Sequence, residues 1–274
     1  MLKNTVTLVA TDLDGTLLNS KKEVSKENKE AIMKLKENGI LFGIASGRPV
    51  ETIRAMIKDW GLDQDVSFIM GMNGGAIYDV RRREKEDFHL LEGETVIDIM
   101  KFFEDMDVIF QVLVGADRYV NKSTEETRAN AKLFGENEIL VDLYSFLENR
   151  MVNKLIINCD PSYMPKVVQR AKEYHNDECV GFMTADYLFE YVDPIINKGY
   201  GLCKLARHFG ISLAHTVAFG DEANDLDMLL MAGKGVCMKN GSDKAKQIAD
   251  VVSNYTNDEN AIAHFIEDYI LEEA

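Results

Sequence analysis

Two aspartates, Asp12 and Asp14, directly follow an apolar segment near the start of the chain. One such carboxylate can attack phosphorus as a nucleophile while its neighbour exchanges a proton with the departing oxygen. Gly15 then allows a tight turn that brings the backbone close to a ligand. The same residue types also begin Asx turns and calcium loops. The apolar segment before them reads as a buried parallel strand, which favours an active site over both alternatives.

Further polar side chains follow other predicted strands, and a lysine begins a predicted helix. These side chains are Ser46, Lys198, Asp221, Asn224 and Asp225. Taken singly, Ser46 could cap a helix, Lys198 could be a solvated surface residue, and residues 221–225 could be an acidic helix start. Ligands of open α/β sheets bind beyond the carboxyl ends of the strands. Their shared placement therefore favours one joint site.

The charge of this predicted site calls for a counter-ion. Four carboxylates and one lysine sum to −3 (−4 + 1), and like charges about 4 Å apart repel by about 4 kcal/mol at an effective dielectric constant near 20. A hard divalent cation relieves this repulsion, and a set of oxygen ligands favours Mg²⁺. Crowding of like charges also raises the pKa of one carboxyl group, which can then keep a proton for general-acid work.

Strand and helix patterns alternate at both ends of the chain, which predicts a doubly wound parallel α/β sheet. The predicted strands are residues 5–10, 40–45, 66–70, 216–219, 235–238 and 251–252. The predicted helices are residues 25–38 with Ser25 as the N-cap, 49–61, 198–209, a short one after residue 225, 243–249 and a last one from about 260.

In the middle of the chain, predicted strands and helices do not alternate in this regular order. Its predicted helices are residues 94–106, 123–134 and 162–175, and its predicted strands are 110–114, 154–158 and 187–192. Ser123 and Glu126 are predicted to form a capping box. We therefore expect a discontinuous α/β core over residues 1–82 and 191–274, with an α+β domain inserted at residues 83–190.

Composition excludes several classes of partner. With 31 Lys and Arg against 46 Asp and Glu, the formal net charge is −15, which argues against binding to nucleic acid or to anionic lipid. The one basic run, Arg81–Arg83, is followed by Glu84 and Glu86 and is interpreted as a solvated linker. The 4 cysteines are single and suit a reducing compartment. No apolar run is long enough for a membrane span. We expect a cytoplasmic protein, monomeric or homodimeric.

The chain resembles a known superfamily, the haloacid dehalogenase-like phosphohydrolases. Its four motifs match, in order, Asp12-Leu13-Asp14-Gly15-Thr16, Ser46-Gly47-Arg48, Lys198-Gly199 and Gly220-Asp221-x-x-Asn224-Asp225. Residues 40–49 and 73–75 resemble the Cof-like branch, which carries a large C2-type cap. The first two motifs lie only 32 positions apart (46 − 14), too few for a cap, whereas 152 positions (198 − 46) separate Ser46 from Lys198.

The resemblance implies a Rossmann-like core and a role for each motif residue. Asp12 would be the nucleophile that becomes an aspartyl-phosphate, and Asp14 the acid for the leaving alcohol and then the base for water. Mg²⁺ would be held by the Asp12 carboxylate, the Asp14 backbone carbonyl and Asp221. The transferring phosphoryl group would contact Ser46, the N–H groups of Leu13 and Gly47, Lys198 and Asn224. Asp225 would orient Lys198 or metal-bound water.

These roles predict a Mg²⁺-dependent phosphatase that hydrolyses a small phosphorylated metabolite, such as a sugar phosphate or a phosphorylated cofactor. A phosphomutase or phosphotransferase on the same core is an alternative, because phosphate could pass to a second alcohol. A non-catalytic ligand sensor is another, which the intact set of motif residues disfavours.

Overall fold

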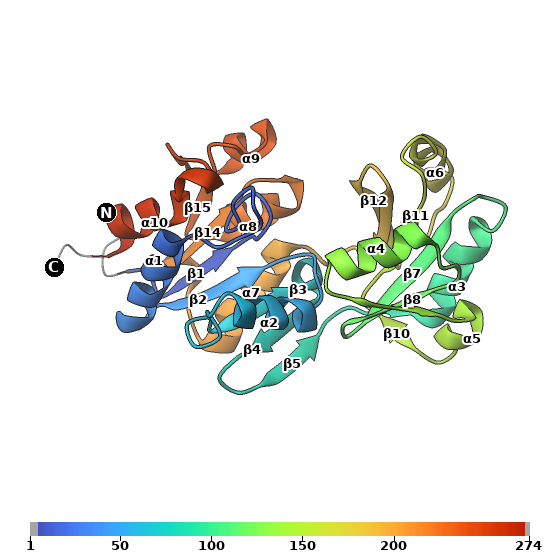
Figure 1. Cartoon of the computed structure of the whole chain (residues 1–274), viewed down its shortest axis with the longest axis horizontal. Helices are drawn as coiled ribbons and strands as arrows, with labels where there is room; N and C mark the ends of the chain where they lie inside the picture. Colours follow the sequence, from blue (N-terminus) through green and yellow to red (C-terminus); the bar gives the residue numbers. More distant parts are fainter. Residues whose placement is uncertain (1–4, 272–274) are drawn as a thin grey trace. The chain divides into compact units, whose positions relative to one another are not determined.

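The computed structural model describes residues 5–271, which form two compact units (Figure 1). One unit comprises the described residues before Asp87 and after Ile196, and the other comprises Asp87–Ile196. The boundaries expected from the sequence, after residues 82 and 190, lie slightly upstream of this division. A boundary after residue 190 would cut β13 (Leu188–Val192), which pairs along its length with strands of the second unit.

The first unit is built on a mostly parallel sheet. Its strands are β1 (Leu8–Thr11), β2 (Leu41–Ala45), β3 (Phe68–Gly71), β4 (Ala76–Asp79), β5 (Glu84–Asp87), β14 (Thr216–Gly220), β15 (Lys234–Cys237) and β16 (Val251–Val252). Their spatial order is β16-β15-β14-β1-β2-β3-β4-β5. All four residues of β1 are buried, as expected for a central parallel strand. The predicted parallel sheet is thus confirmed, and it gains the antiparallel strand β4 beside β3.

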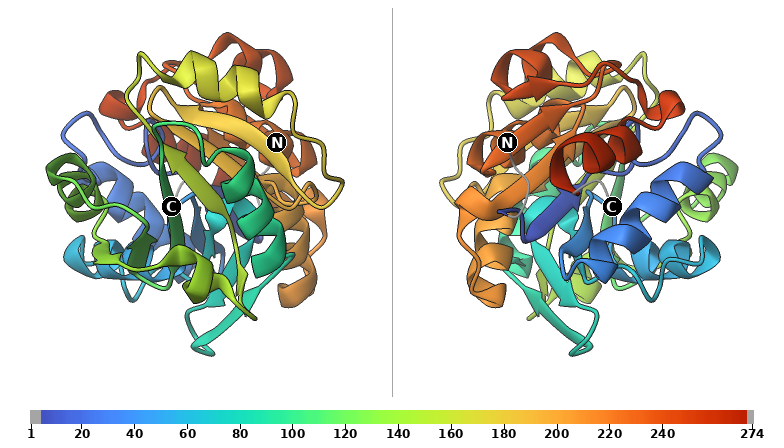
Figure 2. Two further views of the ribbon diagram at one scale, coloured as in Figure 1. Left: turned by 90° about the vertical axis from the view of Figure 1, so that its right-hand side faces the viewer. Right: turned by 90° about the vertical axis from the view of Figure 1, so that its left-hand side faces the viewer.

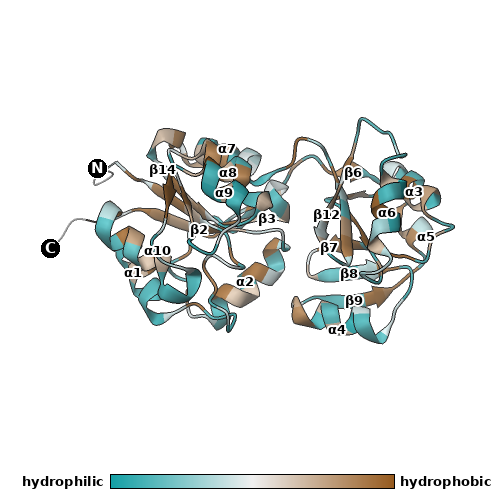
Figure 3. Ribbon diagram, turned by 90° about the horizontal axis from the view of Figure 1, so that it is seen from above, coloured by the Kyte–Doolittle hydropathy of each residue, from teal (hydrophilic) through white to brown (hydrophobic). Residues whose placement is uncertain are grey.

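Helices cover both faces of this sheet. They are α1 (Lys26–Glu37), α2 (Val50–Asp59), α7 (Lys198–Phe209), α8 (Leu226–Met231), α9 (Asp243–Ile248) and α10 (Ala261–Phe265). The predicted N-cap of α1 is confirmed, because the Ser25 hydroxyl accepts the Asn28 N–H at 3.1 Å. α1 packs against α10, although the two helices lie near opposite ends of the sequence (Figure 2, right-hand view). The central strands β2 and β14 are predominantly hydrophobic, and α1 carries hydrophilic residues (Figure 3).

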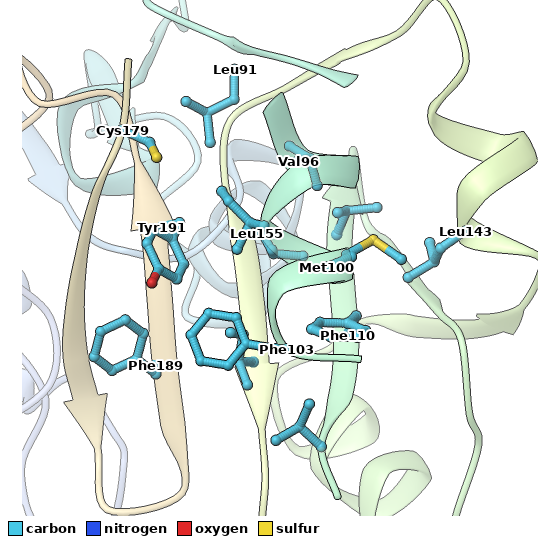
Figure 4. Close-up of a cluster of buried hydrophobic side chains, with 14 of the residues drawn as sticks. Leu91, Val96, Met100, Phe103, Phe110, Leu143, Leu155, Cys179, Phe189 and Tyr191 are labelled. Carbon is cyan, nitrogen blue, oxygen red and sulfur yellow. The ribbon is translucent and has the colours of Figure 1, made fainter. Parts of the chain in front are cut away.

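The second unit has its own sheet and core. Its strands are β6 (Leu91–Glu92), β7 (Ile109–Val114), β8 (Asp117–Val120), β9 (Asn137–Leu140), β10 (Met151–Val152), β11 (Leu155–Asn158), β12 (Val180–Ala185) and β13. Its helices are α3 (Gly93–Phe102), α4 (Glu125–Leu133), α5 (Leu143–Leu147) and α6 (Met164–Ala171). The main sheet has the order β12-β13-β11-β7-β8-β9, and β6 and β10 pair with each other in a separate two-stranded sheet. Met100 and Phe103 pack from the α3 side onto Phe110, Leu155 and Tyr191 of the sheet (Figure 4).

The predicted capping box at residues 123 and 126 is wrong by one residue. Thr124 caps α4, since its hydroxyl accepts the Thr127 N–H at 3.1 Å and the Thr127 hydroxyl accepts the Thr124 N–H at 2.9 Å. Ser123 instead donates to Glu138 at 2.5 Å and accepts from Arg128 at 2.8 Å. This long-range partner takes the Ser123 hydroxyl away from the helix terminus.

None of the helices formed by residues 5–271 has the length and hydrophobicity that crossing a lipid bilayer requires.

Candidate active site

Three adjacent strands end at the same edge of the first sheet. β1 lies between β2 and β14 and is parallel to both, and its last residue, Thr11, is opposite Ile44 of β2 and Phe219 of β14. Asp12 follows β1, Ser46 follows β2 and Asp221 follows β14. The Asp12 N–H continues the ladder by donating to the Phe219 carbonyl at 3.0 Å. The parallel strands therefore bring Asp12, Ser46 and Asp221 to one edge of the sheet, as predicted.

The first turn of α7 supplies the cation of this site. The Asn197 side chain caps α7 by accepting the Tyr200 N–H at 2.8 Å. This cap sets Lys198 as the first residue of the helix, with its side chain completely buried. Lys198 Nζ donates to Asp12 Oδ1 at 2.5 Å and to Asp225 Oδ1 at 2.6 Å. One ammonium group thus links two buried carboxylates.

Asp225 is fully occupied by protein donors. Its Oδ1 binds Lys198, and its Oδ2 accepts the backbone N–H groups of Asp221 and Glu222 at 2.9 and 3.1 Å. Both oxygens are therefore used in positioning Lys198 and the loop after β14. This geometry agrees with a supporting role better than with a metal ligand.

Asp12, Asp221 and Asp225 form a group that could hold a metal ion, because their carboxylate oxygens lie within 4.8 Å of one another. All three side chains are buried. Within residues 5–271, no donor engages Oδ2 of Asp12 or Oδ2 of Asp221. Two carboxylate oxygens are therefore available to a cation, and an all-oxygen set of this kind suits Mg²⁺.

The turn after β1 is shaped around Asp221. The Leu13 carbonyl accepts the N–H groups of Thr16 and Leu18, at 3.4 and 2.9 Å, and the Thr16 hydroxyl donates to Asp221 Oδ1 at 2.6 Å. Gly15 has φ of +85°, and a Cβ there would lie 2.2 Å from Asp221 Oδ2. The glycine therefore leaves room for the carboxylate oxygen that remains free of protein donors. Sequence reasoning missed the role of Thr16, although it lies within the first motif.

Burial and neighbouring charges shift the pKa values of three titratable groups in this site. Burial raises the pKa of Asp12, against the opposing effect of Lys198. Burial also raises the pKa of Asp221, to about 6, although the Thr16 hydroxyl opposes it. For Lys198, burial lowers the pKa, but Asp12 and Asp225 outweigh burial and raise it above the ordinary range. The lysine therefore stays charged. A further cation would stabilise the ionised forms of the Asp12 and Asp221 carboxylates.

Asp14 faces different partners from the other aspartates. Its carboxylate binds Arg48 Nη2 at 3.0 Å and Lys22 Nζ at 2.7 Å. Burial raises the pKa of Asp14, but Arg48 and Lys22 outweigh it and hold the pKa below its usual range. The like-charge crowding expected from the sequence acts on Asp12 and Asp221, and not on Asp14. The Asp14–Arg48 pair was also missed, although both residues lie within recognised motifs.

The remaining predicted residues lie around the ends of β2 and β14. Ser46 is buried, and its hydroxyl accepts the Arg48 N–H at 3.3 Å. Asn224 is exposed and donates to Asn73 Oδ1 at 3.3 Å. Asn73 adopts a left-handed φ of 53°, and its side chain lies 3.2 Å from where a Cβ on Gly47 would be. The 73–75 segment therefore meets both the second and the fourth motif.

Comparison with known proteins identifies the family. The sequence model of the haloacid dehalogenase-like hydrolases matches residues 9–266. The chain is 28% identical to the phosphatase YwpJ of Bacillus subtilis (strain 168), over 94% of this chain and 98% of the relative. It is 29% identical to 5-amino-6-(5-phospho-D-ribitylamino)uracil phosphatase YwtE of the same organism, over 94% and 96%.

Comparison with a solved structure indicates the same family. The crystal structure of a haloacid dehalogenase-like hydrolase from Bacteroides thetaiotaomicron superposes with a TM-score of 0.86 at 29% identity, over 96% of this chain and 98% of that one. These findings confirm the resemblance and the predicted fold class. The chain belongs to the haloacid dehalogenase-like hydrolases, in their Cof-like branch, and it is an enzyme of the phosphatase class.

Proposed function

We propose that this enzyme hydrolyses a small phosphorylated metabolite in a Mg²⁺-dependent reaction that passes through a phosphate ester of Asp12. The observation that carries the proposal is the buried Asp12 carboxylate, which is held by Lys198 and lies within 4.8 Å of an Asp221 oxygen. A nucleophile and a potential metal ligand therefore meet beside a fixed positive charge at the sheet edge.

Asp12 would act as the nucleophile. A carboxylate oxygen forms a bond to phosphorus while the bond from phosphorus to the substrate oxygen breaks. Lys198 fixes the orientation of Asp12 and balances the negative charge on the three phosphoryl oxygens. Ser46, the N–H groups of Leu13 and Gly47, and Asn224 would contact those oxygens.

Asp14 would move protons in both halves of the reaction. In the first half it gives a proton to the leaving alcohol, and in the second it takes one from the water that attacks the phosphorylated Asp12. The ionised carboxylate paired with Arg48 and Lys22 is the form that the second half needs. The first half requires the protonated form, so the carboxyl group must release these two cations before it acts as the acid.

The donor set fits a magnesium ion. Asp12 and Asp221 would hold it through carboxylate oxygens, together with the backbone carbonyl of Asp14, and Asp225 would support them through Lys198. The bound ion would supply Lewis-acid neutralisation of the phosphate charge.

The substrate class is proposed from the relatives. Two relatives at 28% and 29% identity are named as phosphatases of 5-amino-6-(5-phospho-D-ribitylamino)uracil. Their substrate is a small molecule with a phosphorylated sugar-alcohol chain. This supports a small phosphorylated metabolite here, and we assign the inserted second unit as a C2-type cap.

A phosphate-release screen over many phosphorylated metabolites tests the proposal. We expect release with Mg²⁺, loss of release with EDTA and recovery when Mg²⁺ is restored, because the free oxygens of Asp12 and Asp221 need a cation before an anionic substrate enters. Turnover that EDTA does not change would contradict the metal requirement. Transfer to a second alcohol without release of inorganic phosphate would favour a phosphotransferase, and no turnover of any compound would favour a ligand sensor.

Gly15→Ala tests the space that Asp221 occupies. The new Cβ would meet Asp221 Oδ2 at 2.2 Å, so we expect at least a ten-fold loss of phosphate release with a rise in the Mg²⁺ concentration needed for half-maximal rate. The left-handed φ should also lower the free energy of unfolding by about 1–3 kcal/mol, measured by urea denaturation.

The matched control is Gly39→Ala. Gly39 has a similar φ of +72°, but a Cβ there would meet nothing within 4 Å. Gly39→Ala should therefore lower the free energy of unfolding through backbone strain alone, and phosphate release should stay normal. An equal loss of activity in both variants would show that backbone strain, and not the contact with Asp221, explains the effect.

A further inference from the structure

A cavity of about 1410 Å³ lies in the first unit, at the amino ends of β2 and β3. Its lining includes Leu41, the first residue of β2, and Ser67, which precedes β3. The predicted phosphate contact Ser46 follows the opposite end of β2. Four strand steps of about 3.3 Å separate the two ends, which is about 13 Å. The cavity is therefore distinct from the catalytic edge of the sheet.

The lining of this cavity is cationic although the chain as a whole is acidic. Six lysines and arginines line it, namely Lys36, Arg54, Lys58, Arg81, Arg82 and Arg83. Three acidic residues line it as well, namely Glu51, Asp63 and Asp79. The excess is +3 (6 − 3), in a chain of net charge −15. We call these six side chains the basic cluster.

Ion pairs within the protein use only part of the basic cluster. Lys36 binds Asp65 at 3.2 Å, and Arg82 lies 3.7 Å from Asp79. The other four members have no carboxylate partner within 4.0 Å in the described part of the chain, and they are Arg54, Lys58, Arg81 and Arg83. These side chains are exposed to solvent, and cations without a carboxylate partner attract an anion from solution.

A buried tyrosine also lines the cavity. Tyr78 is only 6% exposed, and within residues 5–271 its hydroxyl makes no hydrogen bond. The Arg54 guanidinium lies 4.5 Å from the centre of the Tyr78 ring, which holds this arginine against the wall by a cation–π contact. The guanidinium and the tyrosine hydroxyl are both donors suited to phosphate oxygens.

We propose that this cavity is a second, non-catalytic site that binds a linear triphosphate, either inorganic or as part of a nucleotide. The cations come from three separate segments: the end of α1, the exposed side of α2 and the turn between β4 and β5. A chain of phosphates can contact more of these segments at once than one orthophosphate can. Arginine forks bind successive phosphate groups with two hydrogen bonds each.

Calorimetric titration of the full chain tests this site. Tripolyphosphate, ATP and orthophosphate are titrated separately without added Mg²⁺, into wild type and into the double variant Arg54→Ala/Arg83→Gly. We expect tripolyphosphate to bind wild type at least ten-fold more tightly than orthophosphate does, and at least ten-fold more tightly than it binds the double variant. Both substitutions should preserve the fold, since Arg54 is exposed on a helix and Arg83 has a φ of 60° that favours glycine.

The matched control is Arg150→Ala. Arg150 is exposed and lies 4.5 Å from the Phe146 ring, a cation–π contact of the same length in the second unit. It should leave triphosphate binding unchanged. ATP binding as tightly as tripolyphosphate would indicate that the phosphate chain alone is recognised, and tighter ATP binding would indicate a nucleotide; both support the site.

Two results would overturn the proposal. One is the absence of tripolyphosphate binding to wild type. The other is binding that survives in the double variant but is lost in Lys198→Met, because the anion would then occupy the catalytic edge. Thermal midpoints of the variants, measured in parallel, separate lost binding from lost folding. Neither result bears on whether the enzyme hydrolyses phosphate esters, so this test and that of the proposed function fail independently.

Discussion

Asp12→Asn should lower phosphate release by about 10⁴-fold or more, because the amide cannot form the bond to phosphorus. Asparagine has nearly the same shape as aspartate, and Lys198 keeps its second partner, Asp225, at 2.6 Å. The fold should therefore survive. Steady-state phosphate release measures the loss, and acid-quenched mass spectrometry of wild type with substrate should find the phosphoryl group on the peptide that contains Asp12.

The matched control for this variant is Asp225→Asn. Asp225 is buried and binds the same lysine, so its replacement removes the same charge from the same place without removing the nucleophile. We expect a loss of about 10²–10³-fold from the misplaced lysine. If both variants lost the same activity, or if Asp12→Asn stayed within ten-fold of wild type, the nucleophile assignment would be wrong.

A rule of topology is enough to predict from the sequence that these residues lie at one edge of the sheet. Asp12, Ser46 and Asp221 each follow a short apolar segment, and parallel strands bring such positions to one edge whatever the details of packing. Lys198 was found in the same way, because a helix pattern starts at that residue and ends at Gly210, which adopts a left-handed φ of 67°. The ends of these strands and the start of this helix can be predicted because each is indicated by a short continuous segment of the sequence.

The contacts that the sequence did not predict depend on partners distant in the chain. Thr16 and Asp221 are separated by 205 positions, and no local pattern indicates that their side chains meet. Ser123 is lost as a helix cap for the same reason, because Glu138 binds it. Short strands such as β9 were missed because their side chains show no clear alternation of burial.

The basic run at residues 81–83 is exposed, as its sequence favours, but its position in the fold did not follow from the sequence. Its sequence favours a solvated linker, since two glutamates follow closely. In the structure the run lies in the turn between β4 and β5 and lines a cavity together with Arg54 and Lys58 of α2. The run follows β4, whose antiparallel pairing with β3 is not indicated by any local pattern in the sequence.

Lys198→Met should lower phosphate release by about 10²–10³-fold and the free energy of unfolding by about 3–5 kcal/mol. The lysine is completely buried and joins Asp12 to Asp225, so methionine fills the space but leaves two buried carboxylates without their cation. Urea denaturation with EDTA measures the stability, since a bound metal ion would replace the lost charge and mask the effect.

The double variant Lys198→Met/Asp225→Asn separates the chemical role of the lysine from its structural role. Removing the second carboxylate relieves part of the repulsion, so the double variant should recover at least about 1 kcal/mol of stability relative to Lys198→Met. Phosphate release should not recover, because Asp12 still lacks the cation that orients it and balances the phosphoryl charge. Activity that returned together with stability would mean that Lys198 serves the fold alone, and the assignment of its ammonium group to the phosphoryl transfer would have to be abandoned.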